Sequence, residues 1–203
     1  MSELGLFPLP LVLLPTEQMP LHIFEDRYKE LIDECVDEDR SFGLLFADGE
    51  GTNEFGTSAL VVEVLTRFED GRMNILVEGG ERFRVETLTS GRSFQTAVTS
   101  PLLDEDDPAA EEAIDHALEL FGRLKEVTGS DVEVPLADSP QLSYALAARV
   151  ELDPEVKQAL LQATSERDRL ERVRELLVAA AVTVERHRRA AERASTNGRV
   201  DLS

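Results

Sequence analysis

The sequence lacks most of the residues and motifs that mark enzymes and metal sites. It has one cysteine, Cys35, no tryptophan and only 5% aromatic residues. A single cysteine excludes an internal disulfide framework and a CxxC zinc site. The chain has no GxxxxGKS/T loop to hold a triphosphate, no GxGxxG after a strand-like run and no HExxH pair. The sequence therefore predicts no ATPase, dinucleotide-dependent oxidoreductase or zinc protease of the motif-defined kinds.

Basic charge is also scarce. Acidic residues outnumber basic ones by 41 to 21, which gives a formal net charge of −20, and most of the excess lies in the first 110 residues. A field of this sign repels polyanions, so we expect neither nucleic acid nor an anionic membrane as a partner.

The apolar start of the chain is predicted to be neither a signal peptide nor a membrane helix. The run ends at Thr16, short of the about 20 residues that a spanning helix needs, and the first basic residue is Arg27. Four prolines, each without the amide hydrogen that a helix requires, fall within or just after the run: Pro8, Pro10, Pro15 and Pro20. We therefore expect extended segments that begin a β domain of a cytoplasmic protein.

The pattern up to about residue 102 is mostly typical of strands. Runs rich in β-branched and aromatic residues lie at 42–47, 58–69, 72–88 and 93–100. Asp70-Gly71 predicts a hairpin turn between two of them. Gly79-Gly80 interrupts the longest run and predicts a bulge or a corner, which is the feature that curls a sheet. Several short strands with such a corner indicate a small, partly closed barrel.

One amphipathic helix is predicted inside this β region, at residues 25–39. Its apolar residues recur at helical spacing and form one stripe: Tyr28, Leu31, Ile32, Cys35 and Val36. Because Cys35 lies on that stripe, we interpret it as a small buried hydrophobic residue.

The second half changes to a helical period after the acidic segment at 102–112. Apolar residues keep that period to about residue 190, and three capping residues each precede a proline, as at a helix start: Asp107-Pro108, Ser139-Pro140 and Asp153-Pro154. We predict a β-rich domain at 1–103, a helical bundle at 104–194 and a disordered tail at 195–203. The fold class is α+β: a small curled sheet or pseudo-barrel with one embedded helix, then a helical bundle.

No catalytic, cofactor or metal site is predicted. The three histidines, His22, His116 and His187, fall in separate elements and show no metal-ligand spacing. The acidic run at 104–107 lacks the spacing of a calcium loop and is interpreted as a solvated linker.

Two stretches are distinctive, PLHIFEDRY at residues 20–28 and GGERFRV at residues 79–85. They resemble the N-terminal substrate-binding domain of the Lon protease family, and the resemblance extends over roughly residues 4–190. Many relatives carry proline where this chain has Asp26, and aspartate also suits the first turn of a helix. The resemblance implies a compact PUA-like β domain followed by a helical bundle.

Lon proteases also carry an ATPase module and a Ser-Lys peptidase domain, for which this sequence shows neither motif nor length. The resemblance therefore implies a stand-alone, non-enzymatic module that binds unfolded or extended polypeptide. Four large apolar residues near turn signals are the candidate peptide contacts, with core packing as the alternative: Met19, Phe46, Phe55 and Phe68.

Three other functions stay open at this point. The helical bundle could dock on one specific partner, such as a Lon-type protease or a chaperone. The β domain could hold a small ligand in an apolar pocket. Cys35 with a histidine could form a hydrolase site, although no motif supports one. No oligomeric state is predicted.

Overall fold

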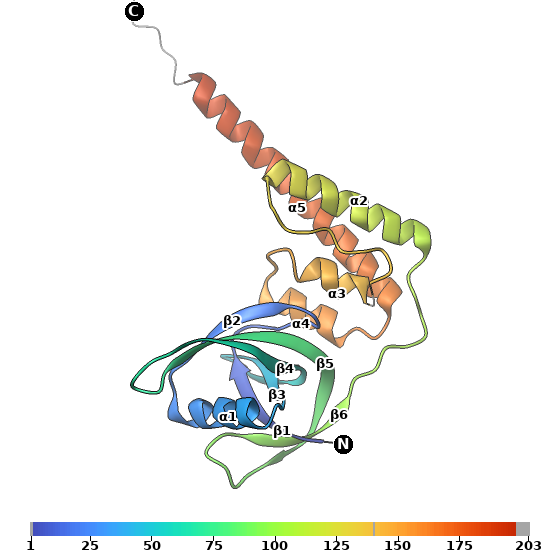
Figure 1. The fold of residues 1–203 in the computed structure, drawn as a ribbon. Coiled ribbons are helices and arrows are strands. Elements are labelled where there is room, and N and C mark those ends of the chain that lie inside the picture. The colour runs from blue at the N-terminus through green and yellow to red at the C-terminus, as the bar shows by residue number, and fades with distance from the viewer. Residues whose placement is uncertain (1, 140, 198–203) are drawn as a thin grey trace, which may run out of the picture.

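The structure, a computed structural model, describes the backbone of residues 2–139 and 141–197 and the side chains of residues 3–139 and 141–190. Its first half consists of strands with one helix, and its second half is helical (Figure 1). The elements of the first half are β1 (Ser2–Leu9), β2 (Gln18–Ile23), α1 (Asp26–Asp37), β3 (Phe42–Asp48), β4 (Gly51–Arg67), β5 (Met73–Thr89) and β6 (Thr96–Pro101).

The strands form one sheet that closes on itself. Its order is β2-β5-β4-β3-β1-β6, and β6 pairs also with β5, so that β5, β4, β3, β1 and β6 complete a ring. β1 and β3 run parallel, and the other pairs are antiparallel. The predicted α+β fold with a small curled sheet is confirmed. Within the described residues, closure leaves β2 as the strand with a single neighbour.

The predicted corner lies where β5 changes its partner. The first half of β5 pairs with β2, and the half after Gly79-Gly80 pairs with β6. Between them, the Gly79 amide donates to the carbonyl of Glu17 at 2.9 Å, and its own carbonyl accepts from the amide of Thr16 at 2.7 Å. A Cβ on Gly79 would lie 2.1 Å from the carbonyl oxygen of Leu14. Glycine is therefore required here by the close approach of a second backbone.

The helix α1 packs its apolar stripe into the barrel core. Tyr28, Leu31, Ile32 and Cys35 are buried there, and the Tyr28 ring stacks on Phe7 with the centroids 4.0 Å apart. Of the predicted stripe, Val36 lies at the margin and is 38% exposed. The interpretation of Cys35 as a buried small hydrophobic residue is confirmed.

The helical half contains α2 (Glu111–Thr128), α3 (Leu142–Ala147), α4 (Pro154–Gln162) and α5 (Glu166–Asn197). Figure 1 shows α2 lying along α5, with α3 and α4 between that pair and the barrel. No described helix is long and apolar enough to cross a membrane. Three residues of the first half, Val12, Leu14 and Phe46, lie in the helical core, so the two halves share apolar packing.

The predicted helix starts are correct in one case and wrong in another. Pro154 opens α4 after its N-cap Asp153. The Asp107-Pro108 pair does not open α2, which begins three residues after the proline at Glu111. Pro140 lies outside the described residues. The predicted tail at 195–203 overlaps the end of α5, and residues 198–203 also lie outside the described residues.

The interpretation of residues 104–107 as a solvated linker is wrong for Asp104. Its carboxylate pairs with Arg82 of β5 and Arg169 of α5, whose side chains are 2% and 0% exposed. Both guanidiniums lie over the Tyr144 ring, that of Arg169 at 4.4 Å and that of Arg82 at 5.6 Å from its centroid. Arg82 also donates to the carbonyl of Leu161 at 2.7 Å. These ion pairs and hydrogen bonds connect the strands to the helices across the predicted domain boundary. The division of the chain into two domains at residue 103 stays a prediction.

Candidate functional site

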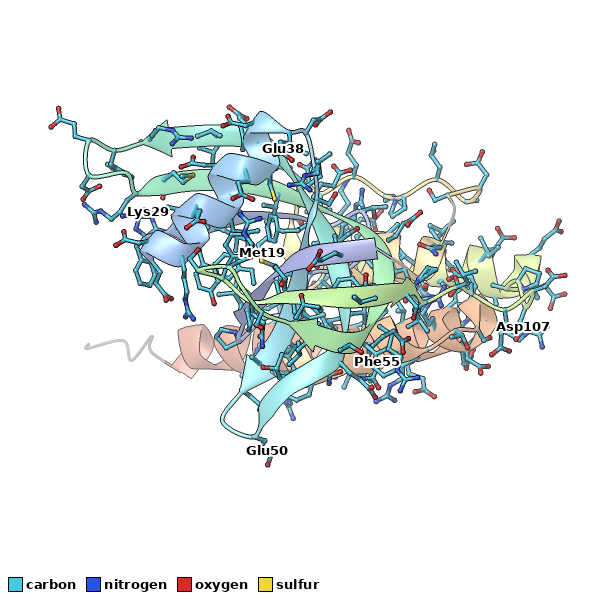
Figure 2. All side chains as sticks on the ribbon, turned by 90° about the horizontal axis from the view of Figure 1, so that it is seen from below. Met19, Lys29, Glu38, Glu50, Phe55 and Asp107 are labelled. Atoms are coloured by element: carbon cyan, nitrogen blue, oxygen red, sulfur yellow. The ribbon has the colours of Figure 1, made fainter. Side chains whose placement is uncertain are left out.

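The structure does not bring the four predicted contact residues to one surface. Met19 is half-buried against the barrel core, and Phe46 is buried in the helical core with 8% exposure. Phe55 is half-buried beside the guanidinium of Arg84. Figure 2 shows Met19 near α1 and Phe55 well away from it. Of the four, only Phe68 is exposed, at 39%. The buried side chain of Phe46 is not accessible to a peptide.

Phe68 belongs to a solvent-facing surface of β2, β5 and β4, which we call the outer face. Along β5, Met73, Ile75 and Val77 point into the core, and the alternate residues point outward. The register aligns these outward residues across the three strands in rows: His22, Asn74 and Thr66; Pro20, Leu76 and Glu63; Gln18, Glu78 and Leu60.

Two register shifts in β4 add apolar residues to the outer face. Val61 and Val64 pack inward against the core, so two successive residues lie outside after each of them. The shifts place Val62 and Leu65 outside, where they are 42% and 46% exposed. The exposed apolar side chains of the outer face are Phe24, Leu60, Val62, Leu65 and Phe68. Such a group on one surface is a common mark of a binding site.

Aromatic rings gather at the hairpin end of the outer face. The His22 ring lies 6.0 Å from the Phe24 ring and 6.2 Å from the Phe68 ring. Its Nδ1 is 2.6 Å from Oδ1 of Asn74, which fixes the ring orientation. The Arg72 guanidinium lies over the Phe68 ring, 5.4 Å from its centroid. These contacts restrict the orientation of the rings, and side chains that are already ordered lose less entropy when a ligand binds.

The outer face borders the free edge of β2. Within the described part of the chain, β2 pairs with β5 on one side and with no strand on the other. Pro20 in the middle of β2 has no amide hydrogen, so the edge offers an incomplete row of donors. Proline on an edge strand also limits edge-to-edge aggregation.

Two carboxylates lie on the outer face among its apolar residues. Glu78 accepts a hydrogen bond from Nε2 of Gln18 at 2.7 Å. Glu63, one row away, forms no hydrogen bond or ion pair with another described residue. The face is therefore apolar with negative charge.

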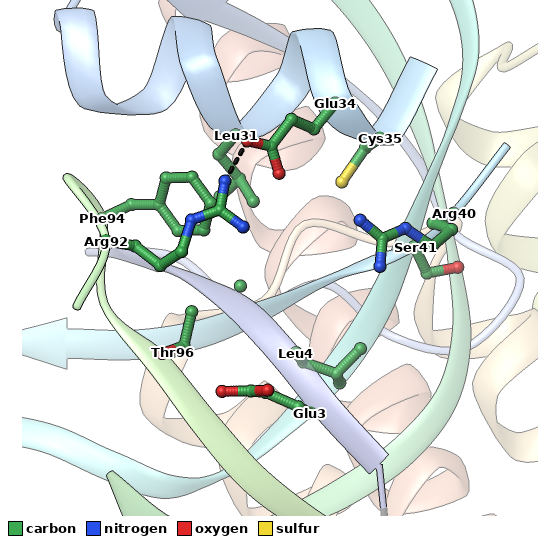
Figure 3. A pocket seen from close by; sticks show the side chains of 11 residues that line it. Glu3, Leu4, Leu31, Glu34, Cys35, Arg40, Ser41, Arg92, Phe94 and Thr96 are labelled. Atoms are coloured by element: carbon green, nitrogen blue, oxygen red, sulfur yellow. Dashed lines mark hydrogen bonds and ion pairs between the residues drawn. The ribbon is translucent and has the colours of Figure 1, made fainter. Parts of the chain in front are cut away.

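A cavity of about 350 Å³ lies between α1 and the strands β1 and β6 (Figure 3). Cys35 lines it, and the two arginines at its wall are neutralised: Arg92 pairs with Glu34, and Arg40 with Glu38 at 2.6 Å. Burial raises the pKa of the Cys35 thiol to about 11, so the thiol stays protonated at neutral pH. No described histidine lines the cavity, and nothing supports a Cys-His hydrolase site.

The histidines lie far apart in the fold. His22 is on the outer face, His116 of α2 lies 2.9 Å from the Arg174 guanidinium, and His187 is exposed on α5. A search of the described residues for three or more His, Cys, Asp or Glu side chains placed to hold a metal ion finds none.

Comparison with known proteins assigns the chain to a family. Residues 3–179 match the family model described as the ATP-dependent protease La (LON) substrate-binding domain. The chain belongs to this family. The resemblance predicted from residues 20–28 and 79–85 is therefore confirmed, and family membership indicates a substrate-recognition module.

Solved structures of the family share the fold. A Lon N-terminal domain protein from Xanthomonas campestris has 27% sequence identity and a TM-score of 0.67, with 85% of this chain and 97% of that chain covered. The N-terminal domain of the Mycobacterium avium complex Lon protease has 16% identity and a TM-score of 0.68, with 87% and 98% covered.

A full-length relative is matched only in part. The Lon protease of Nitratidesulfovibrio vulgaris is 29% identical over 136 residues, which cover 61% of this chain and 16% of that protein. The similarity is to the substrate-binding domain and not to the catalytic domain. Proteolytic activity is therefore not transferred to this chain.

Proposed function

We propose that this domain binds unfolded or extended polypeptide on the outer face, beside the free edge of β2. The observation that supports the proposal is the group of exposed apolar residues Phe24, Leu60, Val62, Leu65 and Phe68 on a sheet whose edge strand β2 has one free edge. A folded globular partner would hide its apolar side chains, whereas an unfolded chain exposes them. Membership of a substrate-binding family agrees with a polypeptide ligand.

An extended peptide can use both features of this surface at once. One segment adds to the free edge of β2 as a further strand, and the next segment crosses the outer face, because an added strand lies three strand spacings, about 14 Å, from β4. Pro20 removes one donor from the edge, so side-chain contacts carry more of the affinity than backbone hydrogen bonds. Each large apolar side chain that becomes buried contributes about 1.5–3 kcal/mol.

Paired leucine variants test the proposal. Leu65 lies on the outer face and is 46% exposed, whereas Leu88 lies on the distal half of β5 and is 55% exposed. Both substitutions, Leu65→Ser and Leu88→Ser, remove an exposed leucine from a strand and are expected to leave folding intact. We expect Leu65→Ser to weaken the binding of a permanently unfolded, fluorescently labelled protein about tenfold, and Leu88→Ser to leave it unchanged.

The readouts are fluorescence anisotropy and suppression of aggregation of a heat-denatured substrate. Phe68→Ser is a second outer-face variant and should act in the same direction. Failure of the unaltered protein to bind any unfolded chain would overturn the proposal. Equal losses in Leu65→Ser and Leu88→Ser would show that the outer face is not the binding surface.

A further inference from the structure

A pocket of about 490 Å³ lies in the helical half, between α2, α5 and the segment after α3. Its volume falls within the range of about 300–1,000 Å³ found for ligand pockets. The floor is apolar and is made by Phe121, Leu124, Val150, Ala180 and Val184. None of the pocket residues belongs to the outer face.

Two cations of this pocket have no carboxylate partner. Of the three lysines, Lys29 pairs with Asp26 and Lys157 with Glu17, whereas Lys125 in the pocket pairs with none. Arg149 donates only to the carbonyl of Ala145, at 2.6 Å. Most other arginines with described side chains are ion-paired. In a chain with 41 acidic residues, two cations of one pocket that have no carboxylate partner are suited to pair with an anion.

The remaining polar groups suit a peptide. Thr128 and Thr183 donate their hydroxyl hydrogens to backbone carbonyls of their own helices, so their oxygens are free to accept from a ligand amide. Ser130 adds a third hydroxyl, whose oxygen already accepts from the Val132 amide at 3.3 Å. Glu151 supplies one negative charge to the lining, so the pocket carries two cations against one carboxylate.

We infer that this pocket binds the free C-terminal carboxylate of a polypeptide whose last side chains are apolar. The apolar floor takes the terminal side chains, Lys125 and Arg149 pair with the carboxylate, and the hydroxyl oxygens accept from the last peptide amides. This pocket would bind the C-terminal ends of chains, whereas the outer face would bind internal segments. An experiment can therefore refute either proposal without refuting the other.

The test compares one peptide in two forms. A fluorescein-labelled decapeptide that ends in Leu-Val-Ala is made with a free carboxylate and with a C-terminal amide, which removes the negative charge and replaces one acceptor oxygen with an NH2 donor. We expect the acid to bind at least tenfold more tightly than the amide, with an affinity that falls as salt rises.

Variants that remove one positive charge test whether this pocket recognises the carboxylate. Lys125→Gln and Arg149→Gln should each remove most of the preference for the acid. Arg186→Gln is the matched control, because Arg186 is another cation of the helical half without an ion-pair partner and lies outside this pocket. It should keep the preference unchanged.

Three outcomes would overturn the inference. Equal binding of acid and amide would show that the carboxylate is not recognised. A preference that survives both Lys125→Gln and Arg149→Gln would place recognition elsewhere. Binding of decanoate at this pocket without binding of the acid peptide would assign it to fatty acids in place of chain ends. The unfolded, labelled protein used for the outer face serves as a separate control, since its internal segments should bind equally to all three variants.

Discussion

Asp104 and Arg169 form a two-point pair: Nη1 of Arg169 lies 2.7 Å from Oδ1 of Asp104, and Nη2 lies 2.6 Å from Oδ2. Arg82 pairs with the same carboxylate from the barrel side. The Asp104 carboxylate thus bridges two nearly buried guanidiniums that come from different halves of the fold, and Glu166 supplies a second negative charge to Arg169 at 2.7 Å. This junction and the shared apolar packing of Val12, Leu14 and Phe46 both connect the barrel to the helices.

Removal of the Asp104 charge should destabilise the protein strongly. Asp104→Asn leaves Arg82 and Arg169 buried with less compensation, and loss of one partner of a buried ion pair costs about 3–5 kcal/mol. Urea denaturation followed by circular dichroism measures the change. The control is Asp106→Asn, because Asp106 is exposed in the same acidic run and should change stability by less than about 0.5 kcal/mol. Equal effects of the two variants would contradict the role of the network.

The same pair predicts acid sensitivity. Burial raises the pKa of Asp104, but the hydrogen bonds and positive charges of Arg169 and Arg82 lower it more, so its pKa in the folded state is below the usual value. Because the pKa of Asp104 is lower in the folded state, its ionised carboxylate stabilises the protein fully at pH values above the unfolded-state pKa, about 3.9 for aspartate. This contribution is lost as the pH falls from that pKa through the lower folded-state pKa. Stability of the unaltered protein should therefore fall more steeply below about pH 4 than that of Asp104→Asn. Parallel curves from pH 5 to pH 2.5 would contradict this.

The junction also shows where sequence reasoning stops. Asp104 lies in an acidic run whose local pattern is that of a solvated linker, and its partner Arg169 is 65 residues away in the chain. No local periodicity of the sequence predicts a contact between residues so far apart in the chain. By contrast, the α1 stripe, the Asp70-Gly71 turn and the Gly79 corner follow from local backbone preferences, and the structure has each of them.

The outer face was missed for a different reason. A regular strand alternates inward and outward residues, but the register shifts in β4 put Val62 and Leu65 outside in addition to the expected positions. The contact residues chosen for size and nearness to turns therefore included only one member of the face, Phe68. Closure of the sheet, which decides that β2 keeps a free edge, is likewise a property of the whole fold and not of any segment.

Two glycines should respond in opposite directions to alanine. A Cβ on Gly79 would lie 2.1 Å from the Leu14 carbonyl oxygen, so Gly79→Ala must displace backbone and should cost about 1–3 kcal/mol. Gly122 lies inside α2 with no atom within 4 Å of its added Cβ. Gly122→Ala should therefore stabilise the protein by about 0.5–1 kcal/mol, because alanine loses less backbone entropy in a helix. Thermal unfolding of both variants measures the contrast, and destabilisation by Gly122→Ala would contradict it.

The charge of the outer face should select among peptides. Glu63 lies beside Leu76 without a partner, so an apolar peptide with interspersed lysines should bind more tightly than the same peptide with glutamates. An exposed pair contributes about 0.2–1 kcal/mol, so Glu63→Gln should weaken the lysine peptide by up to about fivefold and leave an uncharged peptide unaffected. Glu126→Gln, which removes an exposed carboxylate from α2, is the matched control for the net charge of −20. If both variants weaken the lysine peptide equally, the preference arises from the overall charge and not from Glu63.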